Sequence, residues 1–203
     1  MRLILMRHGE TIWNAEQRLQ GHENAPLSAR GIEQARSFRR VAQDLAPSRV
    51  VSSDLGRCRE TVGLIGYADA PSDPRLRELR MGVWSGRRKP DLIAEYADKY
   101  WAWRAGSYQP EGGESWLEFQ GRVVDGLRDW LRRGDGDLLA VVHSGVIRAA
   151  LSAFLGLPQD RMVPVTPGTA TLLNFENAAS DKVRLEGYNI GLFAPQTADA
   201  VSD

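Results

Sequence analysis

Short apolar runs alternate with longer amphipathic segments along most of this chain. The runs 3–6, 50–51 and 138–142 are uncharged and too short for helices, which is typical of buried strands. Two later stretches, 169–175 and 183–188, have the alternation and the turn residues between them that predict further strands. Strands that alternate with helices predict an α/β fold, a three-layer α/β/α sandwich whose mostly parallel central sheet carries helices on both faces.

Several segments between the strands have apolar residues at helical spacing. The predicted helices are 28–45, 91–103, 116–133 and 146–155. Ser115 and Glu118 form a capping-box pattern at the start of the third, and Gly156 ends the fourth. Asp54 is expected to cap a further helix that runs to about residue 65.

The chain has 203 residues, of which 42% are hydrophobic and 26% charged, a profile that is typical of one globular domain. We expect that domain to cover residues 1–193, followed by a flexible tail at 194–203 that lacks periodicity. Cys58 is the only cysteine, which excludes an intrachain disulfide and any CxxC motif. A buried structural thiol is the better interpretation of it than a redox switch.

The charge balance and hydropathy exclude several classes of partner. Lys and Arg number 26 and Asp and Glu number 26, so the formal net charge is zero. Nucleic acid or an anionic membrane as the main partner would favour a basic excess, so we expect neither. No apolar run approaches a membrane span and no signal-peptide pattern is present, so we expect a cytoplasmic protein.

Two of the three histidines follow predicted strands. His8 and His143 each come directly after an apolar run and shortly before a glycine. Because the carboxyl ends of parallel strands meet at one edge of a sheet, we expect both imidazoles in one site. A neutral imidazole can act as a nucleophile, and the planar fork of Arg7 suits phosphoryl oxygens. His22 has no such context and is interpreted as a surface-loop histidine.

Two other positions carry candidate chemistry. Arg57 follows the run 50–51 and is expected in the first turn of the next helix, where the helix dipole favours an anion. Taken alone, it is better interpreted as a surface arginine. Glu78 lies among apolar and basic residues, where a carboxyl group is either structural or a general acid. The basic run 87–89 is interpreted as a solvated helix entry rather than a substrate-steering patch.

Taken together, the motifs resemble, in order, those of the histidine phosphatase superfamily, which includes the cofactor-dependent phosphoglycerate mutases. The resemblance covers about residues 3 to 150. Its elements are Arg7-His8-Gly9-Glu10-Thr11-Ile12-Trp13-Asn14, Leu19-Gln20-Gly21, Pro26-Leu27-Ser28 with Gly31 and Gln34-Ala35, Ser53-Asp54-Leu55 with Arg57 and Glu60-Thr61, Arg75-Leu76-Arg77-Glu78, Gly112-Gly113-Glu114-Ser115, and Val142-His143 with Gly145-Val146-Ile147-Arg148.

The resemblance implies a role for each catalytic position. His8 matches the nucleophile that becomes phosphohistidine. Arg7, Arg57 and His143 match the groups that hold the phosphoryl oxygens and offset charge in the transition state. Glu78 matches the general acid, which protonates the leaving oxygen and then accepts a proton from water. No metal and no other cofactor is expected, because cationic side chains take that role.

Substrate contacts are implied in the same way. Asn14 matches a phosphate contact, and Gln20 and Gly21 match a loop near the phosphate and the substrate. Ser144 replaces a glycine that is common in the family; we expect it to keep a backbone N–H at the site and to cap the following helix. The segment 79–115 matches a cap over the pocket, although core packing is the default interpretation of its aromatic residues.

The resemblance implies a phosphomonoester hydrolase that acts on a small phosphorylated metabolite through a phosphohistidine intermediate. A cofactor-dependent phosphoglycerate mutase is the first alternative, but only about 36 residues separate Glu78 from Ser115, and mutases usually have a longer insertion there. A non-catalytic module that binds phosphorylated ligands is the second, although no catalytic position is missing. A metalloenzyme is disfavoured, since the chain has no HExxH pattern. The sequence does not identify the natural substrate. It also leaves open whether the protein forms a homodimer, as some members of the family do.

Overall fold

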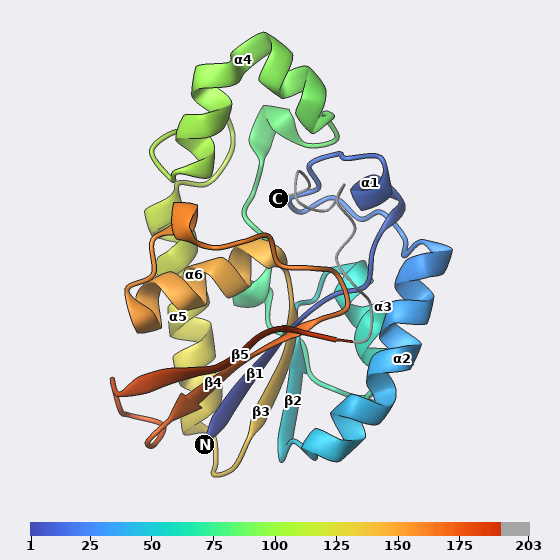
Figure 1. The fold of residues 1–203 in the computed structure, drawn as a ribbon, viewed down its shortest axis with the longest axis vertical. Helices are drawn as coiled ribbons and strands as arrows, with labels where there is room; N and C mark the ends of the chain where they lie inside the picture. The colour runs from blue at the N-terminus through green and yellow to red at the C-terminus, as the bar shows by residue number, and fades with distance from the viewer. Residues whose placement is uncertain (192–203) are drawn as a thin grey trace.

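A computed structural model describes residues 1–191, and a five-stranded sheet of strand order β2-β3-β1-β4-β5 forms its centre (Figure 1). The strands are β1 Arg2–Arg7, β2 Arg49–Ser52, β3 Leu138–Val142, β4 Ala170–Phe175 and β5 Val183–Ile190. All five lie where the apolar runs and alternating stretches predict them. The tail predicted at 194–203 lies outside the described residues.

Five of the six helices lie where they are predicted, and the short helix α1 was not predicted. They are α1 Ile12–Ala15, α2 Ala29–Leu45, α3 Gly56–Leu64, α4 Lys89–Arg104, α5 Trp116–Arg132 and α6 Ser144–Leu155, with short 3-10 turns at η1 Pro74–Leu76, η2 Gly82–Trp84 and η3 Gln159–Arg161. The capping box of Ser115 and Glu118 is formed, and Gly156 ends α6 in the left-handed conformation. Within residues 1–191, no helix has both the length and the apolar character that crossing a bilayer requires.

Two predicted helix caps are wrong. Leu55, not Asp54, precedes α3, because the Asp54 carboxylate instead accepts hydrogen bonds from Nε and Nη2 of Arg77. The two-point bond joins two opposite charges in a fixed geometry, which explains the choice of partner. Ser144 is the first residue of α6 rather than its cap, and His143 holds the cap position.

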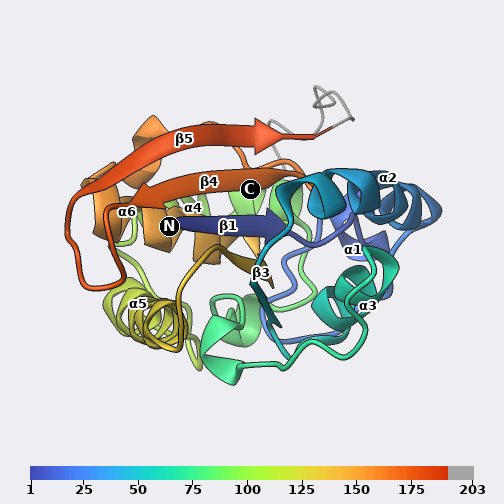
Figure 2. The ribbon, with the colours of Figure 1, turned by 90° about the horizontal axis from the view of Figure 1, so that it is seen from below.

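Alternating strand residues build two cores, one on each face of the sheet. Leu3 and Leu5 of β1 belong to the core that is shared with α5 and α6. Ile4 and Met6 belong to the core on the other face, with residues of α2 and α3. Figure 2 shows the two helix pairs on opposite sides of the strands. The predicted α/β/α sandwich with helices on both faces is therefore confirmed.

The sheet is mixed, which corrects one part of the prediction. β3 pairs in parallel with β1 and with β2, whereas β4 pairs antiparallel with both β1 and β5. The short connection between β4 and β5 explains the antiparallel pairing of these two strands, because a short loop can join only antiparallel strands and a parallel pair needs a long crossover.

The carboxyl ends of β1, β2 and β3 point toward the end of the molecule where α4 lies (Figure 1). An aromatic cluster anchors α4 there. Trp84 packs against Tyr100, Trp103 and Tyr108, with ring centroids 5.5 to 6.4 Å apart. Core packing is confirmed for Tyr100, which is buried, but it is wrong for Trp101, which is 59% exposed. The cluster fixes α4 beyond the tips of the parallel strands.

Candidate active site

Two histidines meet where β1 and β3 end. The strands pair in register up to Arg7 and Val142, and the backbone N–H of His8 donates to the carbonyl oxygen of Val142 at 3.0 Å. The rings of His8 and His143 then lie with their centroids 5.2 Å apart at an interplanar angle of 65°. Both side chains are buried. Parallel pairing thus brings together two imidazoles that are far apart in the sequence.

The hydrogen bonds of His8 define its tautomer. Its Nδ1 lies 2.7 Å from the carbonyl oxygen of Gly9, which can only accept, so Nδ1 carries the proton and Nε2 holds the lone pair. Burial, together with the charges of Arg57 and Arg7, holds the pKa of His8 well below its ordinary value. The ring is therefore a neutral imidazole whose lone pair is on Nε2, the form that nucleophilic attack requires.

Arg57 is fixed between the two rings. Its Nη1 and Nη2 donate to the carbonyl oxygens of Glu23 and Gly21, each at 2.8 Å. Its Nε lies 3.2 Å from Nε2 of His8 and 3.3 Å from Nδ1 of His143. The first turn of α3 holds this arginine, as predicted, but the side chain is buried rather than exposed. A preplaced cation thus adjoins the lone pair of His8.

His143 is held from behind. Its Nε2 lies 2.9 Å from Oγ of Ser53 and 3.5 Å from Sγ of Cys58. Burial and the charge of Arg57 keep its pKa well below the ordinary value. Cys58 is buried, as predicted, and burial raises the pKa of its thiol to about 12, so the thiol stays protonated. Ser53 and Cys58 therefore pack behind the ring and fix its orientation.

Glu78 reaches the same place from the segment after η1. Its Oε1 accepts from the N–H of Leu79 at 2.8 Å, and its Oε2 accepts from the N–H of Gly145 at 3.0 Å. A Cβ at position 145 would lie 2.1 Å from Oε1, so the carboxylate can approach α6 only because that residue is glycine. The acidic group is thereby fixed at the N-terminus of α6.

A cavity of about 670 Å³, which includes space open to solvent, joins these groups. All the predicted site residues line it except His143, which lies behind Arg57; the lining includes Asn14, Gln20, Gly21 and Ser144. The side-chain oxygens Oε1 of Gln20 and Oγ of Ser144 are buried and have no hydrogen-bond partner within residues 1–191. Such atoms are suited to contact a bound molecule.

The comparison with known proteins agrees with this geometry. The model of the histidine phosphatase superfamily, branch 1, matches residues 3–190. The chain belongs to this superfamily. A protein described as a probable phosphoglycerate mutase GpmB, from Escherichia fergusonii, is 39% identical over 166 residues, which are 78% of this chain and 76% of that protein. The GpmB of Enterobacter sp. is also 39% identical over 166 residues, with the same coverage.

Solved structures of phosphatases superpose on this histidine phosphatase. A mycobacterial glucosyl-3-phosphoglycerate phosphatase, in complex with VO3, has a TM-score of 0.84 and 29% identity over 93% of this chain and 98% of that chain. An α-ribazole phosphatase of Shigella flexneri has a TM-score of 0.79 and 29% identity over 97% and 100%. The chain is thus an enzyme of the phosphatase type, as the motif resemblance predicts.

The pocket of this histidine phosphatase also has lining residues that the sequence analysis did not assign to the site. They are Arg18, Leu19, Leu79, Met81, Lys89, Trp103, Arg104, Trp116, Gly145, Arg148 and Gln159. The interpretation of Lys89 as a solvated residue is wrong, since only 4% of it is exposed. It begins α4, and its backbone N–H donates to the carbonyl oxygen of Gln17, which holds it against the pocket wall.

One signal could have revealed part of this lining. Arg148 follows Ser144 by one helical turn, so the two share a face of α6. Lys89 and Arg104 carry no comparable signal, because they lie at opposite ends of α4 and only its placement brings both to the pocket. No group of three potential metal ligands among His, Cys, Asp and Glu occurs in the described part of the chain.

The buried histidines predict acid sensitivity of this histidine phosphatase. His8 and His143 have lowered pKa values in the fold, whereas the unfolded chain has ordinary values near 6.5. Below pH 6.5 the unfolded chain therefore binds more protons, and stability falls by up to about 1.4 kcal/mol per pH unit for each ring. We expect Tm to drop as pH is lowered from 6.5 to about 5, and His8→Asn to reduce that slope. A flat Tm over this range would contradict the burial of two neutral rings.

Proposed function

We propose that this enzyme hydrolyses the phosphomonoester of a small acidic metabolite through a phosphohistidine at His8. The single observation that supports this most strongly is the neutral Nε2 of His8, which lies 3.2 Å from Nε of Arg57. A lone pair beside a fixed guanidinium suits attack on a phosphoryl group, whose oxygens the guanidinium can hold.

In the first step, Nε2 of His8 forms a bond to phosphorus while the bond from phosphorus to the leaving oxygen breaks. Arg7 and Arg57 stabilise the charge that develops on the phosphoryl oxygens, and His143, whose Nδ1 lies 3.3 Å from Nε of Arg57, supports that guanidinium. Glu78, in its protonated form, donates its proton to the leaving oxygen, so the leaving group departs as an alcohol. Acid–base help of this kind contributes roughly 100- to 10,000-fold to the rate.

In the second step, water attacks the phosphohistidine. The Glu78 carboxylate accepts a proton from that water as the new P–O bond forms, and the bond between phosphorus and Nε2 of His8 breaks. Phosphate is released, the imidazole returns to its neutral form and Glu78 is protonated for the next cycle. No atom or charge is left over at the end of the two steps.

The remaining predicted residues differ in what they can offer a substrate. Oδ1 of Asn14 accepts from the N–H of Thr11, so the Nδ2 group is the one suited to donate to a phosphoryl oxygen. Nε2 of Gln20 donates to Oγ1 of Thr11, so its Oε1 is suited to accept from a substrate hydroxyl or a water. Ser144 can do either. We assign the first two to the phosphate and the substrate respectively.

The outer part of the pocket supports an acidic leaving group. Lys89, Arg104 and Arg148 line it, and Glu78 is its sole acidic lining residue within residues 1–191. The cationic side chains of Lys89 and Arg104, at the two ends of α4, and of Arg148 on α6 would attract a carboxylate or a second phosphate. We propose that the segment 79–115 acts as a cap that presents Lys89 and Arg104, within a single domain that spans 1–193.

A phosphoglycerate mutase is the second candidate, because the GpmB relatives are described as probable mutases. The two reactions share the first step and differ in whether water or a second substrate receives the phosphoryl group. The purified enzyme is to be assayed with 3-phosphoglycerate, with and without 2,3-bisphosphoglycerate, beside a panel of phosphorylated metabolites. We expect release of inorganic phosphate with most turnover on acidic esters. Efficient interconversion of phosphoglycerates with little phosphate release would reverse the choice.

A further inference from the structure

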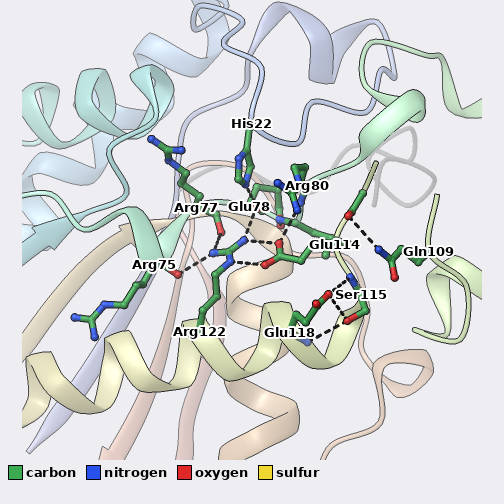
Figure 3. Close-up of polar contacts among 12 residues, drawn as sticks. His22, Arg75, Arg77, Glu78, Arg80, Gln109, Glu114, Ser115, Glu118 and Arg122 are labelled. Atoms are coloured by element: carbon green, nitrogen blue, oxygen red, sulfur yellow. Dashed lines mark hydrogen bonds and ion pairs between the residues drawn. The ribbon is translucent and has the colours of Figure 1, made fainter. Parts of the chain in front are cut away.

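Arg122 of α5 binds the backbone of the segment that carries Glu78. Nη1 of Arg122 donates to the carbonyl oxygens of Arg75 and Arg77, each at 2.8 Å, and Nη2 donates to the carbonyl oxygen of Glu78 at 2.9 Å. Figure 3 shows the guanidinium extending from α5 to this segment. Arg122 thus binds the backbone of Glu78, and none of these three hydrogen bonds involves the Glu78 carboxylate.

Glu114 holds that guanidinium in place. Its Oε1 accepts from Nε of Arg122 at 2.6 Å and its Oε2 accepts from Nη2 at 2.7 Å, which is the two-point geometry that fixes a guanidinium plane. The backbone N–H of Glu114 also donates to the carbonyl oxygen of Arg80 at 3.0 Å. The Glu114 side chain is only 11% exposed, so water competes weakly for the pair.

His22 approaches the same carbonyl group from the other side (Figure 3). Its Nε2 lies 2.9 Å from the carbonyl oxygen of Glu78, which can only accept, so Nε2 carries a proton. His22 lies in a turn and is half-buried. It follows Gly21, whose carbonyl oxygen accepts from Arg57. The carbonyl oxygen of Glu78 therefore accepts hydrogen bonds from two sides, from His22 in the loop after Gly21 and from Arg122 on α5.

We propose that Arg122, Glu114 and His22 form an acid clamp, a set of positioning residues that fixes the backbone of Glu78 so that its carboxyl group meets the leaving oxygen. The proposal rests on the proposed role of Glu78 as the general acid. The glutamate side chain has three rotatable bonds, so its carboxyl position depends on where its backbone is held. Because a misplacement of about 1 Å can cost roughly 100-fold in rate, fixing this peptide group controls proton transfer.

The clamp predicts a selective defect rather than a general one. Phenyl phosphate and p-nitrophenyl phosphate have the same shape at the reacting centre, but phenolate leaves poorly without a proton and p-nitrophenolate leaves well. In Arg122→Gln, we expect kcat/KM for phenyl phosphate to fall at least about ten-fold more than kcat/KM for p-nitrophenyl phosphate. Arg122→Lys keeps the charge but not the planar guanidinium. We expect its ratio of kcat/KM values for the two substrates to lie between those of Arg122→Gln and the parent enzyme.

Two comparisons separate positioning from a loss of structure. Arg128 lies on the same helix and binds the carbonyl oxygen of Ser180 and the carboxylate of Asp181, so Arg128→Gln should leave the ratio between the two substrates unchanged. In the Glu78→Gln background, adding Arg122→Gln should not change the ratio further, because the group through which it acts is gone. An equal loss on both substrates in folded Arg122→Gln, or a further ratio change in the double variant, would overturn the clamp.

His22 gives a second route that does not depend on the folding of the Arg122 variants. His22→Ala removes a donor to the Glu78 carbonyl oxygen, whereas His22→Gln keeps an N–H that can reach it. We expect the phenyl phosphate defect in His22→Ala and its partial rescue in His22→Gln; identical ratios in the two would count against the clamp. If Glu78→Gln itself shows no dependence on the leaving group, the proposed acid role fails first, so the two failures are distinguishable.

Discussion

Replacing His8 with alanine is expected to reduce phosphate release by roughly a million-fold, the scale on which an enzyme loses rate when its nucleophile is removed. The reason is that the proposed path passes through a covalent bond to Nε2, and the other neutral imidazole beside Arg57, that of His143, does not line the cavity. The measurement is kcat/KM on p-nitrophenyl phosphate. Rapid acid-free quenching should also trap the phosphoryl group on the parent enzyme and not on the variant.

The His8→Ala variant must be shown to be folded, because the ring that it removes packs against His143 in a buried site. Thermal unfolding of the variant and the parent is compared above pH 6.5, where protonation of His8 in the unfolded chain does not lower the stability of the parent. Phosphate release by the folded variant within about ten-fold of the parent rate would rule out His8 as the nucleophile.

Replacing Glu78 with glutamine is expected to slow phenyl phosphate by roughly 100- to 10,000-fold and p-nitrophenyl phosphate far less. Glutamine keeps the shape of the side chain but has no acidic proton to give to the leaving oxygen. A good leaving group does not need that proton, so the ratio of kcat/KM values for the two substrates measures the acid role directly. Hydrolysis of the phosphohistidine, where the same carboxylate accepts a proton from water, should slow as well.

Interpretation of Glu78→Gln needs one structural control. Leu79 and Gly145 donate to the two carboxylate oxygens, and an amide nitrogen would meet one of these donors unfavourably. Gly145→Ala provides a matched perturbation, because its Cβ would displace the carboxylate without removing the proton. A partial and still leaving-group-dependent defect is expected there. Equal losses on both substrates in Glu78→Gln would exclude Glu78 as the acid.

Local features of the sequence determined most of the framework. Uncharged runs such as 138–142 predict buried strands because they are too short for helices, and the capping box of Ser115 and Glu118 sets the start of α5 within one turn. The sequence could place His8 and His143 together because the carboxyl ends of parallel strands lie at the same edge of a sheet.

Long-range contacts decided the rest. Asp54 has the sequence of a helix cap, yet it binds Arg77, and Lys89 has the sequence of a solvated cation, yet it lies buried in the pocket wall. No local sequence pattern predicts that His22 and Arg122 both bind the carbonyl oxygen of Glu78. Local patterning fixes which residues lie on a helix or strand. Only the packing of distant segments fixes which donor meets which acceptor, because that depends on positions in space that no short stretch of chain encodes.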